Sequence, residues 1–162
     1  MSQDATGLNE GDTAPDFDMP ASAGRIVSKQ ALTGRPFVLY FYPKADTPGC
    51  TKEACAFQEA LPQLAKLGIE VIGVSRDKIK PIEKFAEKYS LTFPLASDEA
   101  GDASTAYDTW VEKSMYGKKY MGLERSTFLV DRHGKIAKIW RKVSVPGHAK
   151  AVADAVAALE GA

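Results

Sequence analysis

FVLYFYPKADTPGCTKEACAF, residues 37–57, joins an apolar run to a helical pattern through a loop that contains two prolines and a glycine. Residues 37–42 are all aliphatic or aromatic, which is typical of a strand covered on both faces in a parallel sheet. Apolar side chains then recur mostly three or four positions apart over residues 51–67, and Gly68 follows as a stop signal. These residues predict a helix, with a kink near Pro62.

The rest of the chain continues the alternation of strand and helix. Residues 70–75 predict a second buried strand, and Lys80-Pro81 opens a helix that runs through Tyr89. We expect an extended piece over residues 91–95, a short helix over 98–107 and a loop over 110–123.

A hairpin and a final helix complete the pattern. Residues 127–130 and 136–140 flank Asp131-Arg132-His133-Gly134, a turn sequence, and therefore predict antiparallel strands. Near the start, we expect a short strand at 26–27 and a helical turn over 28–32. An Ala/Val stripe at helical spacing covers residues 148–159. This order predicts an α/β fold with a central mixed sheet and helices on both faces.

Length and charge exclude several functional classes. The chain has 162 residues with 21 Lys+Arg and 21 Asp+Glu, which suits one domain without the basic surface that nucleic acid or anionic lipid requires. The longest apolar run is far shorter than the roughly 20 residues of a membrane span, and the N-terminus lacks a signal pattern. We expect a cytoplasmic protein with a flexible leader over residues 1–13 and a single domain over 14–162.

The loop before the predicted helix has the features of a reactive cysteine site. It leaves the carboxyl end of a strand, where ligands bind in open α/β sheets. Cys50 falls in or just before the first helical turn, where free N–H groups and the helix dipole favour the thiolate. Thr47 can direct a hydroxyl into the same pocket.

Other cysteine chemistries fit the sequence poorly. A Cys–His hydrolase would need an imidazole near Cys50, but His133 lies in a hairpin turn and His148 at a helix start. A zinc site would need a paired ligand spacing that the two cysteines and two histidines lack. A thioredoxin-type reductase would need Cys-x-x-Cys, whereas four residues separate Cys50 from Cys55.

Pro43, Thr47 and Cys50 reproduce a Pro-x-x-x-Thr-x-x-Cys motif, and the chain resembles peroxiredoxins of the Q type, also called bacterioferritin comigratory proteins. The resemblance extends from Ala14-Pro15-Asp16-Phe17 to Gly134-Lys135-Ile136. It implies a thioredoxin-like fold and a thiol peroxidase that reduces hydrogen peroxide and organic hydroperoxides. It also implies a monomer that needs no metal or other cofactor. From the charge balance and the short apolar runs, neither nucleic acid nor a membrane is expected as a partner.

The same resemblance implies a role for each residue of the motif. Cys50 would be the peroxidatic cysteine, Thr47 would hydrogen-bond the peroxide and Pro43 would shield the site. Arg125 would complete the site with its guanidinium, and Glu53 would be the acid that orients arginine. A fixed guanidinium and a hydroxyl are suitable donors to the oxygen that leaves when a thiolate attacks a peroxide.

Cys55 is implied by the resemblance to be the resolving cysteine, in a Cys50–Cys55 disulfide that thioredoxin or a similar dithiol reduces. On an ideal helix the two cysteines are separated by about 140° and a rise of roughly 7.5 Å. Their Cα atoms would be about 8 to 9 Å apart, beyond the roughly 7 Å that a disulfide allows. Forming the bond therefore requires the first helical turns to unwind.

Simpler roles exist for each of these residues. Cys55 could be core filler, Thr47 a helix cap and Pro43 a strand terminator, while Arg125 could be a surface ion-pair partner and Glu53 an acid answering the helix dipole. Arg125 would lie beside the Cys50 loop only if its strand neighboured residues 37–42. A redox sensor or binding module on the same fold, with slow oxidation, is the alternative to a peroxidase.

Overall fold

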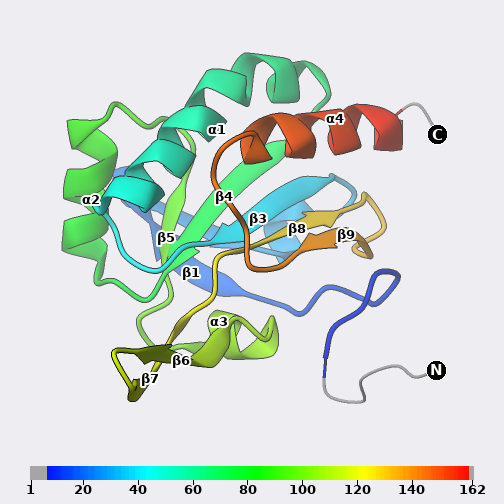
Figure 1. The fold of residues 1–162 in the computed structure, drawn as a ribbon. Helices are drawn as coiled ribbons and strands as arrows, with labels where there is room; N and C mark the ends of the chain where they lie inside the picture. Colours follow the sequence, from blue (N-terminus) through cyan, green and yellow to red (C-terminus); the bar gives the residue numbers. More distant parts are fainter. Residues whose placement is uncertain (1–6, 161–162) are drawn as a thin grey trace.

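The computed structural model describes residues 7–160 and contains a seven-stranded sheet and a separate two-stranded hairpin (Figure 1). Neighbouring strands of the large sheet follow the order β2-β1-β5-β4-β3-β8-β9. Its strands are β1 (Asp18–Ala21), β2 (Arg25–Ser28), β3 (Phe37–Phe41), β4 (Glu70–Ser75), β5 (Leu95–Ser97), β8 (Ser126–Val130) and β9 (Ile136–Trp140). Parallel and antiparallel pairs coexist, so the predicted mixed sheet is confirmed.

Strand β3 lies inside the sheet, as its unbroken apolar composition predicts. It pairs in parallel with β4 and antiparallel with β8, and all of its residues are buried. Both faces of the strand must be covered, because successive side chains point to opposite faces. The register pairs Phe41 with Ser126, so the residue that precedes β8 lies next to the loop that leaves β3.

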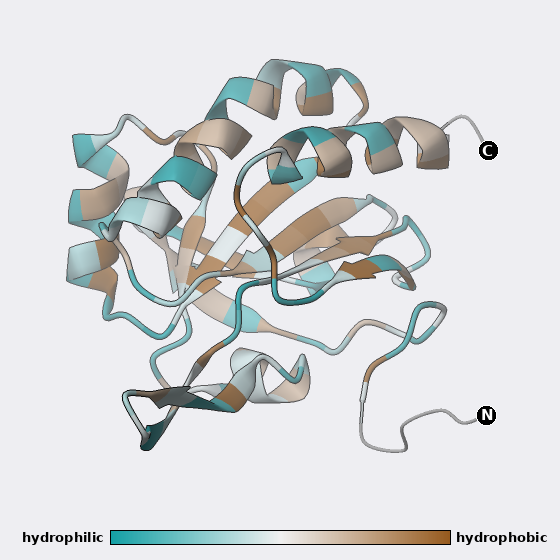
Figure 2. Cartoon of the chain, viewed as in Figure 1, coloured by the Kyte–Doolittle hydropathy of each residue, from teal (hydrophilic) through white to brown (hydrophobic). Residues whose placement is uncertain are grey.

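Three helices contribute to the larger apolar cluster on one face of the sheet: α1 (Pro48–Lys66), α2 (Ile79–Lys88) and α4 (His148–Glu160). Their polar sides face away from the apolar strands (Figure 2). The short α3 (Asp102–Ala106) contributes to a second cluster on the other face. Within residues 7–160, no helix is both long and apolar enough to span a bilayer.

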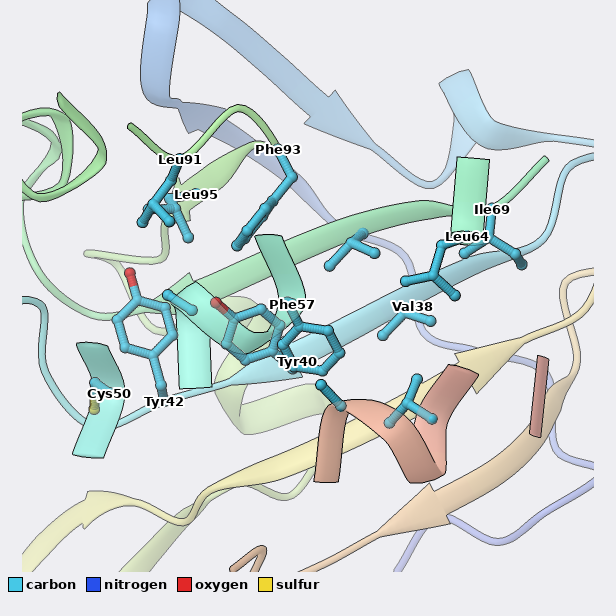
Figure 3. Close-up of a cluster of buried hydrophobic side chains, with 14 of the residues drawn as sticks. Val38, Tyr40, Tyr42, Cys50, Phe57, Leu64, Ile69, Leu91, Phe93 and Leu95 are labelled. Atoms are coloured by element: carbon cyan, nitrogen blue, oxygen red, sulfur yellow. The ribbon is translucent and has the colours of Figure 1, made fainter. Parts of the chain in front are cut away.

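The core beneath α1 is aromatic and ends at Cys50. Tyr40 stacks on Phe57 with ring centroids 4.7 Å apart, and Tyr42 lies between this stack and Cys50 (Figure 3). Helix α1 continues past Pro62 to Lys66 and turns its buried side chains, including Ala54, Phe57 and Leu64, towards the sheet. The helix that carries Cys50 is thus anchored by its middle and its C-terminal half.

The prediction of a loop over residues 110–123 is wrong, because these residues form the hairpin of β6 (Trp110–Met115) and β7 (Lys118–Leu123). Tyr116 and Gly117 both have positive φ, 53° and 80°, as a two-residue hairpin turn requires. Most of the hairpin is exposed, so its strands lack the apolar alternation that reveals a half-buried strand. At the base of the hairpin, the ring of Trp110 packs beneath the Arg76 guanidinium, which joins the hairpin to the rest of the domain.

Two further elements differ in extent from the prediction. The helix expected over 98–107 is reduced to α3, and Asp98 lies before it, where its carboxylate accepts hydrogen bonds from the amides of Ala103 and Ser104 in the first turn. The extended piece expected over 91–95 enters the sheet only at Leu95. Proline has no N–H to give to a strand pair, and Pro94 precedes that entry.

The N-terminal region is tied to the sheet. Residues 1–6 of the expected leader lie outside the described residues, but Gly11 and Ala14 donate backbone hydrogen bonds to Ile136 and Gly134 of the β8–β9 hairpin. Strand β2 and the turn η2 (Gln30–Leu32) match the expected strand and helical turn, whereas β1 and the turn η1 (Ser22–Gly24) were not predicted. The leader boundary before residue 14 stays a prediction.

His148 connects several elements at the start of α4. Its Nε2 atom lies 2.7 Å from the hydroxyl of Thr127 on β8, and its ring packs edge-on against Phe57 of α1 and Trp140 of β9. Burial, with a smaller contribution from the charge of Arg125, lowers the pKa of His148 to about 4. Above about pH 4 the folded protein therefore holds a neutral imidazole that joins α4 to α1, β8 and β9.

This burial predicts a pH dependence of stability. Between about pH 4 and pH 6.5 the unfolded chain binds a proton at residue 148 that the folded chain does not, so acidification favours unfolding. Replacing His148 with Gln should make the free energy of unfolding fall less on acidification through this range than it does in the wild type, as measured by urea denaturation. His133→Gln, at the exposed turn, is the control and should keep the wild-type dependence; equal dependence in all three proteins would contradict the prediction.

Candidate active site

Cys50 lies in the first turn of α1 at the carboxyl end of β3. Thr47 is the N-cap residue with extended backbone dihedral angles, Pro48 opens the helix, and the Thr51 amide donates to the Thr47 carbonyl. Proline suits the first turn because its missing N–H would have no helical partner there. Cys50 is only 2% exposed, so the thiol sits where the helix N-terminus favours negative charge and little water competes.

Side chains from neighbouring elements fix the loop between β3 and α1. The Ala45 amide donates to Asp77 at 2.7 Å, just beyond β4. Asp46, which has a positive φ of 61°, accepts hydrogen bonds from Lys88 and Tyr89 of the α2 region, and these bonds lower its pKa. A positive φ is unfavourable for most residues other than glycine. The contacts of Asp46 therefore help to maintain a conformation that the loop alone would hold less well.

Arg125 lies beside the Cys50 loop, as expected for a strand that neighbours β3. Its Nη2 atom is 3.5 Å from Cys50 Sγ, and its Nη1 atom donates to Glu53 Oε1 at 2.7 Å. The side chain of Arg125 is 17% exposed and that of Glu53 is 2% exposed, so their ion pair is buried rather than a surface pair. One guanidinium thus contacts both acidic groups of the first turns of α1.

Glu53 stands three residues after Cys50 and faces inward from the same side of the helix. Burial raises its pKa to about 7, although the neighbouring Arg125 charge acts in the opposite direction. Its Oε2 atom has no hydrogen-bond partner among the described residues. The helix-dipole role considered for Glu53 does not account for a buried, half-paired carboxyl group.

Gly49 and Asp77 belong to the site but were missed in the sequence. A Cβ atom on residue 49 would lie 3.2 Å from Arg125 Nη2, so the absence of a side chain lets the guanidinium approach Cys50. Gly49 stands inside the motif between Thr47 and Cys50, and its position was the available signal. Asp77 carries no signal of its own, because only the fold brings it to Ala45.

The remaining candidate residues surround this centre. The Thr47 hydroxyl donates to the Lys44 carbonyl at 2.8 Å and makes no side-chain cap to the helix, so the cap alternative does not explain its side chain. Pro43 is exposed at the start of the loop. Cys55 is partly exposed on α1, and both cysteines are free thiols. Within residues 7–160, no group of three or more His, Cys, Asp or Glu side chains is arranged to hold a metal ion.

Comparison with known proteins gives a family. Residues 10–139 match the model of the AhpC/TSA family. The chain is 44% identical over 150 residues to peroxiredoxin Bcp of Bacillus subtilis, covering 93% of this chain and 94% of that protein. It is 40% identical over 141 residues to peroxiredoxin Bcp of Escherichia coli, covering 87% of this chain and 90% of that protein.

Solved structures agree with these relatives. The bacterioferritin comigratory protein of Xanthomonas campestris, solved as a trapped intermediate/ligand complex, superposes with a TM-score of 0.85 and 42% identity over 89% of this chain and 92% of that chain. A mutant of Xylella fastidiosa PrxQ superposes with a TM-score of 0.89 and 38% identity over 95% and 98%. The chain therefore belongs to the AhpC/TSA family, among its Q-type peroxiredoxins, and is a thiol-dependent peroxidase with a thioredoxin-like fold.

Proposed function

We propose that Cys50 is the peroxidatic nucleophile of this peroxidase and that Arg125 activates it. The contact of 3.5 Å between Arg125 Nη2 and Cys50 Sγ, in the first turn of α1, carries the proposal. The guanidinium charge and the helix N-terminus both stabilise a thiolate, and the thiolate is the reactive form of cysteine. Glu53 supports the site by holding the other arm of the guanidinium.

The first reaction step forms a sulfur–oxygen bond and breaks the peroxide bond. The Cys50 thiolate attacks one oxygen and becomes a sulfenic acid, while the other oxygen leaves with the electron pair and takes up a proton to give water or an alcohol. Arg125 donates to the peroxide oxygens as charge develops, and Pro43 limits access of water. The Thr47 hydroxyl gives its proton to the Lys44 carbonyl, so its oxygen has lone pairs to accept the O–H of a hydroperoxide.

Both hydrogen peroxide and organic hydroperoxides are proposed substrates. The similar X. campestris protein has alkyl peroxide reduction activity. The reacting end of the two substrate classes is the same, so one thiolate with the same donors serves both. The second oxygen differs only in carrying a hydrogen or a carbon chain.

Cys55 is the proposed resolving cysteine. Its thiol attacks the Cys50 sulfenic acid, which gives a Cys50–Cys55 disulfide and releases water. Both cysteines lie in α1, about 8 to 9 Å apart at Cα on an ideal helix, so the first turns of α1 must unwind. Thioredoxin or a similar dithiol then reduces the disulfide, and the enzyme works as a monomer in the cytoplasm, where such reductants keep thiols reduced.

Single substitutions separate the steps of this cycle. Cys50→Ser should abolish peroxide turnover, and Cys55→Ser should permit one oxidation per chain but no recycling by thioredoxin. Arg125→Ala should slow the oxidation of Cys50 by about a hundredfold, because a charged donor to the reacting atoms is lost. Stopped-flow Trp fluorescence gives the oxidation rate, and intact mass identifies the product. If wild-type Cys50 reacted no faster than free cysteine, the sensor alternative would replace this assignment.

Gly49→Ala tests the contact that carries the proposal. The added methyl group would meet Arg125 Nη2 and push the guanidinium away from Cys50, so the oxidation rate should fall by about tenfold, or ~1.4 kcal/mol. In an Arg125→Ala background the same substitution should cost almost nothing more, because the group it displaces is gone. An equal loss in both backgrounds would show that Gly49 acts on the loop rather than on Arg125.

A further inference from the structure

The active site contains two acidic groups but one positive charge in contact with them. Arg125 contacts Cys50 Sγ at 3.5 Å with one nitrogen and Glu53 Oε1 at 2.7 Å with another. If Cys50 and Glu53 were both ionised, the buried cluster would carry a net negative charge. Such an uncompensated charge is costly where water is excluded.

Glu53 is built to hold the proton that removes this charge. Its side chain is 2% exposed and its Oε2 atom has no hydrogen-bond partner among the described residues. An ionised carboxylate would leave that oxygen charged and unsolvated, whereas a protonated carboxyl keeps Oε1 as an acceptor for Arg125. The pKa of about 7, raised by burial, agrees with this geometry.

No other group packed around the cluster supplies the missing charge. The phenols of Tyr40 on β3 and of Tyr42 just after it are neutral, because burial raises the pKa of each. His148 of α4 is neutral as well, and its Nε2 atom is occupied by Thr127. Lys113 of β6 is positively charged, but burial and Arg125 lower its pKa, and it makes no ion pair within residues 7–160.

We propose that Glu53 stores the proton of the reduced site and releases it when Cys50 is oxidised. This inference rests on the proposed role of Cys50 as the nucleophile. A thiolate, a protonated Glu53 and a hydroperoxide give a sulfenic acid, an ionised Glu53 and an alcohol or water. The leaving oxygen receives the bonding electron pair and one proton, and the carboxyl group supplies that proton.

The transfer has a driving force within the cluster. Cys50 loses its negative charge when it becomes a sulfenic acid, so the guanidinium of Arg125 no longer faces a thiolate. Its charge is then fully available to the Glu53 carboxylate, which it already contacts through Oε1. The proton therefore leaves Glu53 at the step in which the leaving oxygen needs one.

Counting protons taken from solvent tests the proposal. Cys55→Ser protein, in which oxidation stops at the sulfenic acid, is mixed with one equivalent of hydrogen peroxide in weak buffer containing a pH indicator, about one unit below the pKa of Glu53. The ultraviolet absorbance of the thiolate establishes that Cys50 is ionised beforehand. Proton uptake from solvent should be well below one per Cys50 oxidised, because Glu53 supplies the proton.

Glu53→Gln in the same background should take up about one proton per Cys50 oxidised, since an amide does not ionise and cannot release a proton to the leaving oxygen. Glu59→Gln makes the same chemical substitution on the exposed side of α1, away from the site, and should behave like the parent. If the parent took up a full proton as well, the proposal would be overturned while Cys50 remained the nucleophile. If the parent did not oxidise at Cys50 at all, the proposed function itself would fail.

An infrared measurement covers the case in which Glu53→Gln is misfolded or unreactive. In the oxidised-minus-reduced infrared difference spectrum of the parent, the carbonyl band of a protonated carboxyl group should appear as a loss. A carboxylate band should appear as a gain. A protonated carboxyl band that persists after oxidation would overturn the proposal without any Glu53 variant. The proton count and the band report a transfer, which a purely structural role for Glu53 would not produce.

Discussion

The guanidinium of Arg125, held between Cys50 and Glu53, is the interaction around which the site is organised. Its position depends on the antiparallel register of β3 and β8, which pairs Phe41 with Ser126 and so places Arg125 against the loop after β3. A shift of that register by one residue would turn every side chain of β8 to the opposite face of the sheet. The buried strand pair therefore fixes the register, and the register fixes the chemistry.

The loop that presents Cys50 depends on contacts with its surroundings more than on its own sequence. Asp46 adopts a left-handed conformation, and its hydrogen bonds to Lys88 and Tyr89 help to hold it there. Asp77 holds Ala45 from the end of β4. The loop is thereby tied to α2 and β4, while Gly49 leaves room for the guanidinium. A rigid scaffold thus positions a short reactive segment.

The elements that are buried and strongly patterned could be predicted from the sequence. The run at residues 37–42, the helix that follows it and the hairpin around residues 131–134 could be predicted because burial imposes periodicity and turns impose composition. The β6–β7 hairpin could not, since its exposed strands are free of that constraint. In the site, Cys50, Thr47 and Arg125 stood out through a motif and its resemblance. The contact of Asp77 with Ala45 and the half-paired state of Glu53 are products of tertiary packing.

Resolution by Cys55 requires α1 to unwind at one end while it stays anchored at the other. The turns that must open contain Gly49, which has a poor helix propensity, whereas Phe57 keeps its stack on Tyr40 farther along. Opening also exposes Glu53, and a carboxyl group whose pKa is raised by burial favours exposure more strongly once it is ionised. Loss of the Glu53 proton during Cys50 oxidation would therefore weaken the closed helix at the moment when Cys55 must reach the sulfenic acid.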